Sequence, residues 1–165
     1  MNSVAATSKA EKKVRLRIVT PTETKFDEDV DMIIMRCMNG DMGIMYGHDA
    51  RSAALDYGIM RILDNGGERR LAVLGGIAEI KDNLLTVLTN DAEWPEDIDR
   101  AQAEADREHA ERSLETQAGD IEIQRSQILL RRSLVQIEVS SYPFVNKPAE
   151  NADKGENKDA GESKE

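Results

Sequence analysis

The chain has 165 residues, 33% of them charged, and a formal net charge of -10. Its length leaves room for one modest core and an appendage. A net-negative chain without a long basic stripe is a poor nucleic-acid binder. The chain contains no run of eighteen apolar residues, so no membrane span is predicted.

The first half of the chain reads as a series of short strands. Segment 1–13 is polar and predicts a flexible extension rather than a secretory signal. Val14, Leu16 and Ile18 alternate with other residues, a period-two pattern typical of a half-buried strand. Further strand-like runs lie at 30–38, 58–63, 71–74, 77–80 and 84–89. Turn signals such as Asn65-Gly66 and Gly75-Gly76 separate these runs, so we predict an antiparallel β-sandwich over residues 14–92.

A glycine-punctuated segment, 40–48, lies among these runs and is predicted to be a loop. It ends in His48, which has no nucleophile or carboxylate arrangement around it, so no active site is predicted. Cys37 and five nearby methionines favour core or interface packing, and we predict no metal and no cofactor.

The composition changes at Trp94-Pro95, after which helix-forming residues dominate from 100 to 118. Gly119 breaks the pattern, and Asp120 is expected to cap a second helix over 121–140. So short a break predicts an antiparallel two-helix hairpin, assigned to residues 93–141. Residues 142–165 lack apolar periodicity and predict a disordered polar tail. The fold class is therefore α+β.

The second helix carries two apolar stripes when its residues are placed on a helical wheel. The stripes are Ile123, Leu130, Leu134 and Ile137, and Ile121, Ile128 and Val135. One stripe can pack against the first helix, and the other needs the sandwich or another subunit. The first helix offers mainly alanines, so the hairpin is expected to be marginal alone and able to move.

Charge is unevenly distributed between the two helices. Segment 91–120 holds eleven acidic and three basic residues, whereas Arg125, Arg131 and Arg132 are basic positions of the second helix. The arginines form either an ordinary solvated face or a mobile basic patch that binds an acidic surface on a partner.

Segment 40–48 resembles the G-x-x-G-I-x-P-G-H signature of the epsilon subunit of F-type ATP synthases, with Tyr46 in place of the proline. Residues 75–80 are similar to the family's G-G-I-x-E-V strand, and residues 86–89 to its T-V-L-A run. The resemblance extends over about 14–139 and includes the order of sandwich and hairpin.

The resemblance implies a non-catalytic central-stalk subunit, peripheral on the cytoplasmic face of the bacterial plasma membrane. The sandwich would contact the gamma subunit and the c-subunit ring and couple ring rotation to the catalytic alpha/beta head. The hairpin would inhibit ATP hydrolysis. Residue by residue, the resemblance assigns the ring contact to Asp41, Gly43, Gly47 and His48, and the inhibitory contact to Arg125, Arg131 and Arg132.

Some members of this family bind ATP on the folded hairpin through an I-D-x-x-R-A motif. The matching positions here are Ile98, Asp99 and Ala103, with Glu93 and Arg132 at other ligand-contacting positions. Gln102 and Gln136 replace two arginines, and each lost charge-assisted bond to phosphate removes about 1.5–3 kcal/mol. Glu93, Asp99 and Arg132 are thus expected to give weak nucleotide contact or none.

A second interpretation belongs to another class of protein. The chain could be a free-standing β-sandwich protein-binding module with an oligomerising helical hairpin, without a bioenergetic role. Co-purification with gamma and the catalytic head, as opposed to a lone homo-oligomer, distinguishes the two.

Overall fold

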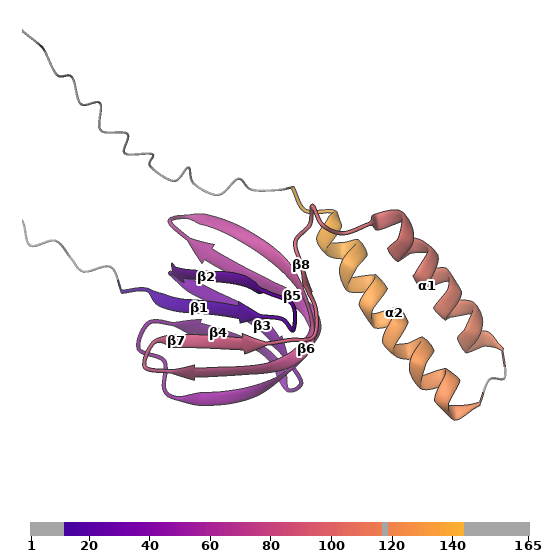
Figure 1. Cartoon of the computed structure of the whole chain (residues 1–165), viewed down its shortest axis with the longest axis horizontal. Helices are drawn as coiled ribbons and strands as arrows, with labels where there is room; N and C mark the ends of the chain where they lie inside the picture. The colour runs from indigo at the N-terminus through magenta and orange to yellow at the C-terminus, as the bar shows by residue number, and fades with distance from the viewer. Residues whose placement is uncertain (1–11, 117–118, 144–165) are drawn as a thin grey trace, which may run out of the picture.

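The computed structural model describes residues 12–116 and 119–143. Its elements, in chain order, are β1 (Val14–Val19), β2 (Thr24–Val30), β3 (Met32–Cys37), β4 (Gly40–Met45), β5 (Arg51–Asp64), β6 (Gly67–Lys81), β7 (Leu84–Leu88), β8 (Ala92–Glu93), α1 (Arg100–Glu115) and α2 (Asp120–Ser140). Figure 1 shows the strands gathered in one body and the two helices beside it. The predicted sandwich followed by a two-helix hairpin is confirmed, while most of the predicted N-terminal extension and tail lie outside the described residues.

The strands follow the order β2-β1-β7-β6-β5-β3-β4, with β8 paired to β6. Neighbouring strands are antiparallel except β1 and β7, which run parallel with Leu16 opposite Leu85. β5 and β6 are the longest strands and pair from Asp64 opposite Gly67 to Arg51 opposite Ile80. The path leaves β2 and β4 as its two edge strands.

Alternation along the strands builds the core. In β1, Val14, Leu16 and Ile18 are fully buried while Arg17 is exposed, as the period-two pattern predicts. The other large, fully buried side chains come from β2 to β7 and include Val30, Ile33, Ile44, Met60, Ile62, Leu71 and Leu85. The sandwich therefore has one contiguous aliphatic core.

One of the two glycine turn signals is confirmed and the other is wrong. Asn65 and Gly66 have φ of 50° and 76° and close the hairpin between β5 and β6. Gly75 and Gly76 also have positive φ but lie inside β6, which continues through them. A Cβ at Gly76 would collide with the carbonyl oxygen of Leu88, so this glycine permits close backbone approach rather than a turn.

Three further expectations about the strands are corrected. Run 30–38 is divided at Asp31 between β2 and β3. β2 itself was not predicted, because only Phe26 and Val30 of this charged edge strand are buried. The predicted loop 40–48 is a strand as far as Met45, since β4 pairs with β3 along its length.

The helices begin at different kinds of residue. The side chain of Asp99 accepts a 3.1 Å hydrogen bond from the backbone N–H of Gln102 and caps α1. Gly119 stands at the N-cap of α2, so the expectation that Asp120 is the cap is wrong. Asp120 instead lies in the first turn, where its negative charge interacts favourably with the helix dipole. α2 lies between α1 and the sandwich and contacts β5 and β6 (Figure 1).

The packed faces of the hairpin differ from the predicted stripes. α1 buries Ala103 and Ala110, as expected, but α2 buries Ser126, Ser133, Gln136 and Val139. Ile121, Ile128 and Leu134 are exposed, at 70%, 52% and 47% of their surface. Small residues at seven-residue spacing on both helices are compatible with a close approach. The other aliphatic side chains of α2 are half-buried, namely Ile123, Leu129, Leu130, Val135 and Ile137.

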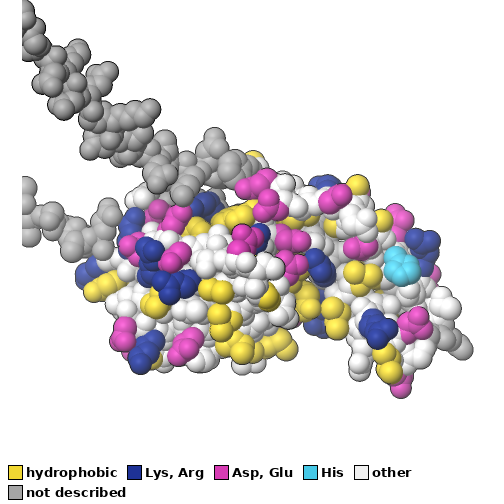
Figure 2. All heavy atoms as spheres, viewed as in Figure 1, with side chains coloured by type: hydrophobic (Ala, Val, Ile, Leu, Met, Phe, Trp, Pro, Cys, Tyr) yellow, Lys and Arg dark blue, Asp and Glu magenta, His cyan; other side chains and the backbone are white. Residues whose placement is uncertain are grey.

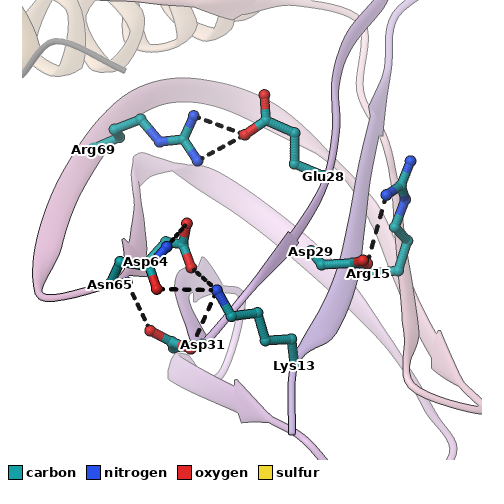
Figure 3. A network of polar contacts seen from close by, with 8 residues as sticks. All are labelled: Lys13, Arg15, Glu28, Asp29, Asp31, Asp64, Asn65 and Arg69. Atoms are coloured by element: carbon teal, nitrogen blue, oxygen red, sulfur yellow. Dashed lines mark hydrogen bonds and ion pairs between the residues drawn. The ribbon is translucent and has the colours of Figure 1, made fainter. Parts of the chain in front are cut away.

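Polar contacts tie the start of β1 to the turn between β5 and β6 (Figure 3). The Lys13 ammonium donates to Asp64 at 2.7 Å and to Asn65 at 3.2 Å, and it lies 3.9 Å from Asp31. The backbone N–H of Asn65 donates to Asp31 at 2.8 Å. These contacts hold the start of β1 and the residue between β2 and β3 against the β5–β6 turn at one end of the sandwich.

Candidate functional site

The residues assigned to the ring contact lie along the edge strand β4 and the turn that follows it. Asp41 is the second residue of β4, Gly43 is in its middle, and Gly47 and His48 follow its end. Ile44 is buried beneath them, so Asp41, Gly43 and Met45 share the exposed face. The strand therefore presents one continuous edge rather than a compact loop.

Asp41 pairs with the opposite residue of β3. Its carboxylate lies 2.9 Å from the Arg36 guanidinium, and the two side chains are 57% and 50% exposed. An exposed pair of this kind contributes little to stability, about 0–1 kcal/mol. Both charges are therefore available to a partner at little cost to the fold.

The turn after β4 is held by backbone contacts. The N–H of Gly47 donates to the side-chain oxygen of Asn83 at 2.6 Å, and Gly47 has a φ of 81°. His48 Nδ1 lies 2.8 Å from the backbone oxygen of Asp49, which favours the tautomer with its proton on Nδ1. Tyr46 is 49% exposed at the tip of this turn. The turn thus displays a tyrosine and an imidazole on a fixed backbone.

The three arginines of α2 have different surroundings. Arg132 lies 2.8 Å from the Asp91 carboxylate and 3.5 Å from that of Glu93. Arg131 is 64% exposed and 3.7 Å from Asp56. Arg125 is exposed and forms no ion pair with any residue in 12–116 or 119–143. In this docked hairpin, two of the three arginines face acids of the sandwich region.

Two of the three residues assigned to nucleotide contact are brought together. Glu93 of β8 approaches Arg132 and also accepts a 2.6 Å hydrogen bond from the side-chain amide of Gln136. Asp99 is engaged elsewhere, as the cap of α1. Glu93 and Arg132 therefore satisfy each other, and a phosphate group would have to displace an existing contact.

A cleft of about 440 Å³ is lined by residues of α2, β3, β4 and β5. Its lining includes Arg36, Asp41, Asp56, Arg131 and Leu134. Residues from the predicted ring contact and from the predicted inhibitory contact thus border the same cleft. On the side of the molecule seen in Figure 2, acidic and basic side chains are interspersed, and no large surface of one sign appears.

Sequence reasoning assigned no role to Asp56 or Asp91, and it considered Gln136 only as the replacement of an arginine, although all three contact residues of the predicted sites. Asp91 and Glu93 flank Ala92, which is fully buried, so alternation could have placed both acids on one outward face. No local sequence pattern indicates that Asp56 contacts α2 or that Gln136 contacts β8, because those contacts join residues far apart in the chain.

The remaining candidate chemistry is limited. Burial raises the pKa of the Cys37 thiol, which disfavours the reactive thiolate. Across residues 12–116 and 119–143, no three His, Cys, Asp or Glu side chains are grouped so as to hold a metal ion. Within the same ranges, neither helix is long and apolar enough to cross a bilayer.

Comparison with family models matches nearly the whole described chain. The model described as ATP synthase, Delta/Epsilon chain, beta-sandwich domain matches residues 13–95. The model described as ATP synthase, Delta/Epsilon chain, long alpha-helix domain matches residues 96–141. The junction between the two models falls just after β8, at the change from strand to helix.

Similar proteins include ATP synthase epsilon chains from several bacteria. The one from Pelotomaculum thermopropionicum is 42% identical over 96 residues, which cover 58% of this chain and 72% of the relative. The one from Bacillus subtilis (strain 168) is 38% identical over 94 residues, 57% of this chain and 71% of the relative.

Among solved structures, a chain of the Euglena gracilis mitochondrial ATP synthase, OSCP/F1/c-ring in rotational state 1, matches with a TM-score of 0.70 and 21% identity. The match covers 86% of this chain and 89% of that one. A chain of the Tetrahymena thermophila mitochondrial ATP synthase central stalk and c-ring gives a TM-score of 0.55 at 14% identity, covering 77% and 96%. At these identities the likeness concerns the fold.

Proposed function

Because this chain belongs to the delta/epsilon family of ATP synthase subunits, as an epsilon chain, we propose that it couples c-ring rotation to the catalytic head and restrains ATP hydrolysis. The sandwich, residues 14–92, would dock on gamma and on the c ring, and the hairpin, residues 93–141, would regulate. The subunit would be non-catalytic and peripheral, on the cytoplasmic face of a bacterial plasma membrane. The observation that carries the proposal is a sandwich and hairpin that both family models match in order.

For the ring contact, the proposed surface is the exposed face of β4 with the turn at Gly47 and His48. It presents polar groups on a fixed edge, and removing Asp41 breaks only an exposed ion pair. Replacing Asp41 and His48 by Ala should leave the sandwich folded and weaken attachment of the catalytic head to washed membranes.

The matched control for this variant is Asp29→Ala. Asp29 is 61% exposed on β2, the opposite edge strand, and also pairs with an arginine. It should leave attachment unchanged. If the Asp41 and His48 variant retains the head as well as this control does, β4 is not the ring contact.

The proposed restraint of ATP hydrolysis by the hairpin, called the brake below, is supported by the way α2 packs on the sandwich. α2 contacts β5 and β6, and its arginines reach the sandwich region through partly exposed pairs. A chain ending at Glu96 keeps every strand and loses both helices. It should fold and still join the enzyme, whose ATP hydrolysis should rise while synthesis is kept. An intact enzyme whose hydrolysis does not respond to this truncation would contradict the brake.

For the contact with the catalytic head, we propose Arg125, Arg131 and Arg132. Arg125 gives the cleaner test, because neutralising it removes no ion pair within the described chain. Changing all three to Gln should raise hydrolysis, since exposed pairs acting together give about 1–3 kcal/mol, about fivefold to 150-fold in the inhibited population. The control changes Arg100, Arg107 and Arg112 of α1 to Gln. Equal rates in both variants would make the α2 arginines an ordinary solvated face.

The nucleotide contact of Glu93, Asp99 and Arg132 is proposed to be weak or absent. Arg132 and Glu93 already engage Asp91 and Gln136, so a polyphosphate competes with contacts that are in place. Calorimetric titration of the full chain with ATP should give little heat at millimolar nucleotide. Micromolar binding would overturn this assignment.

A further inference from the structure

The exposed turn that follows β4 has a defined backbone conformation. The backbone N–H of His48 donates to the carbonyl oxygen of Met45 at 3.1 Å and closes a four-residue turn. Gly47, the third residue, has a φ of 81°, whereas Tyr46, the second, does not have a positive φ. A positive φ at the third position alone is the mark of a type II turn. The side chains of Tyr46 and His48 are therefore presented from a type II turn.

The two central residues do not fix this conformation by themselves. Type II turns favour proline at the second position, because its ring holds φ near the required value, and Tyr46 has no such restriction. Glycine adopts negative φ about as readily as positive φ, so Gly47 permits the turn without selecting it. Both residues are exposed, and no core packing holds them. The selection has to come from outside the turn.

The turn between β6 and β7 supplies a hydrogen-bond acceptor from a rigid position. Its two residues, Asp82 and Asn83, have φ of 50° and 59°, the pattern of a tight type I′ hairpin. The carbonyl oxygen of Asn83 accepts a 2.9 Å hydrogen bond from the backbone N–H of Arg15, which ties this hairpin to β1. The half-buried side chain of Asn83 is left to accept the 2.6 Å hydrogen bond from the N–H of Gly47.

This hydrogen bond connects the turn after β4 to a hairpin 36 positions further along the chain. In the ranges 12–116 and 119–143, no other hydrogen bond joins residues 46–50 to a different element. A contact made in one conformation of a segment and not in the others shifts the population towards that conformation.

From this geometry we infer that Asn83 is a positioning residue for the ring contact. Its side-chain oxygen selects the type II turn that presents Tyr46 and His48, and it acts through the N–H of Gly47. The inference rests on the ring contact proposed above and adds a residue from a separate hairpin to it.

The first test measures the turn in the isolated subunit. Asn83→Gly keeps the tolerance of positive φ and removes the acceptor, whereas Asn83→Asp keeps both. Exchange of the Gly47 amide with water, measured by NMR, should be about twofold to tenfold faster in Asn83→Gly and unchanged in Asn83→Asp. The control is Asp82→Gly, which places a glycine at the other positive-φ position of the hairpin. No acceleration in Asn83→Gly, or equal acceleration in the control, would overturn the inference.

The second test measures attachment of the catalytic head to washed membranes. Tyr46→Pro sets φ at the second turn position without help from Asn83, and Met45 before it is already extended, as a residue before proline prefers. Asn83→Gly should therefore lower the retained fraction of the head in the wild-type background and much less in the Tyr46→Pro background. A residue needed only to fold the β6–β7 hairpin would give equal losses in both backgrounds, and that result would overturn the inference.

Failure of the ring contact itself shows separately, as unchanged attachment in the Asp41 and His48 variant. Exchange of the Gly47 amide then still decides whether Asn83 holds the turn. If the Asp41 and His48 variant weakens attachment and Asn83→Gly does not, Asn83 does not position the contact.

Discussion

The sandwich and the hairpin bury very different side chains. The sandwich encloses large aliphatic residues such as Leu16, Ile62 and Leu85, all fully buried, in a core that spans most of its strands. Among the hairpin residues that the structure describes, the fully buried side chains are Ala110, Ser133 and Val139. Because apolar stabilisation follows buried area, the first region can hold its fold alone and the second is held in position by few and partly polar contacts. The hairpin is therefore expected to detach while the sandwich stays folded.

The largest effect is expected where the sandwich backbone is most tightly packed. Gly76→Ala would place a Cβ against the carbonyl oxygen of Leu88 at a φ of 127°. Strain and overpacking each contribute about 1–3 kcal/mol, so the free energy of unfolding should fall by about 2–6 kcal/mol in denaturant titration. Gly66→Ala is the control, since a Cβ there meets nothing within 4 Å. Equal losses in the two variants would show that crowding at Gly76 is unimportant.

A cavity in the sandwich core comes next. Leu85 is fully buried on β7, between β1 and β6. Leu85→Ala should lower the free energy of unfolding by about 2–5 kcal/mol and shift the whole sandwich transition. Circular dichroism in urea would measure it. A loss below about 1 kcal/mol would mean that this core repacks easily.

The equivalent truncation in the hairpin should act locally. Val139→Ala removes two buried methyl groups, about 1–2 kcal/mol of apolar burial, from the docked face of α2. Amide exchange in α2 should accelerate while the urea midpoint of the sandwich stays that of wild type. If the urea midpoint of the sandwich also fell, the sandwich and the hairpin would unfold as one cooperative unit.

The smallest effect concerns an ion-pair cluster between the two regions. Hydrogen bonds from Arg61 and Arg70 lower the pKa of Glu68 from 4.5 to about 2, and Arg70 stacks 3.7 Å from the ring centroid of Tyr142, beyond the end of α2. A lowered carboxyl pKa adds stability above the unfolded value, which is lost as pH falls from about 4.5 towards 2. Glu68→Gln should therefore flatten stability against pH in this window, measured by urea titration at several pH values. An unaltered slope would show that Glu68 is not the group responsible.

Much of the fold was predictable where local chemistry decides the backbone. The alternation in β1 and the Asn65-Gly66 turn follow from side-chain periodicity and from the tolerance of positive φ. Gly76 has the same conformational freedom, but here it permits the close approach of the Leu88 backbone from another strand. The sequence alone does not show that Leu88 lies there. β4 was missed as a strand for the same reason, since its pairing with β3 outweighs its two glycines, Gly40 and Gly43.

The candidate site was predictable in part. Composition singled out Arg131 and Arg132 as a basic patch on the second helix, yet their acids lie some forty or more positions away in the chain. The seam of Ser126 and Ser133 was missed, because a search for apolar periodicity passes over small polar residues that let helices approach. Tertiary placement, and not composition, decides which charges meet.

Native-state amide exchange of the full chain in increasing urea tests most directly the claim that the hairpin opens while the sandwich stays folded. Amides of α2 should exchange through a local opening at least about 2 kcal/mol less costly than the global unfolding that limits β1 and β7. Their exchange should also depend only weakly on urea. Opening free energies for α2 equal to those of β1 and β7, with the same dependence on urea, would contradict the account.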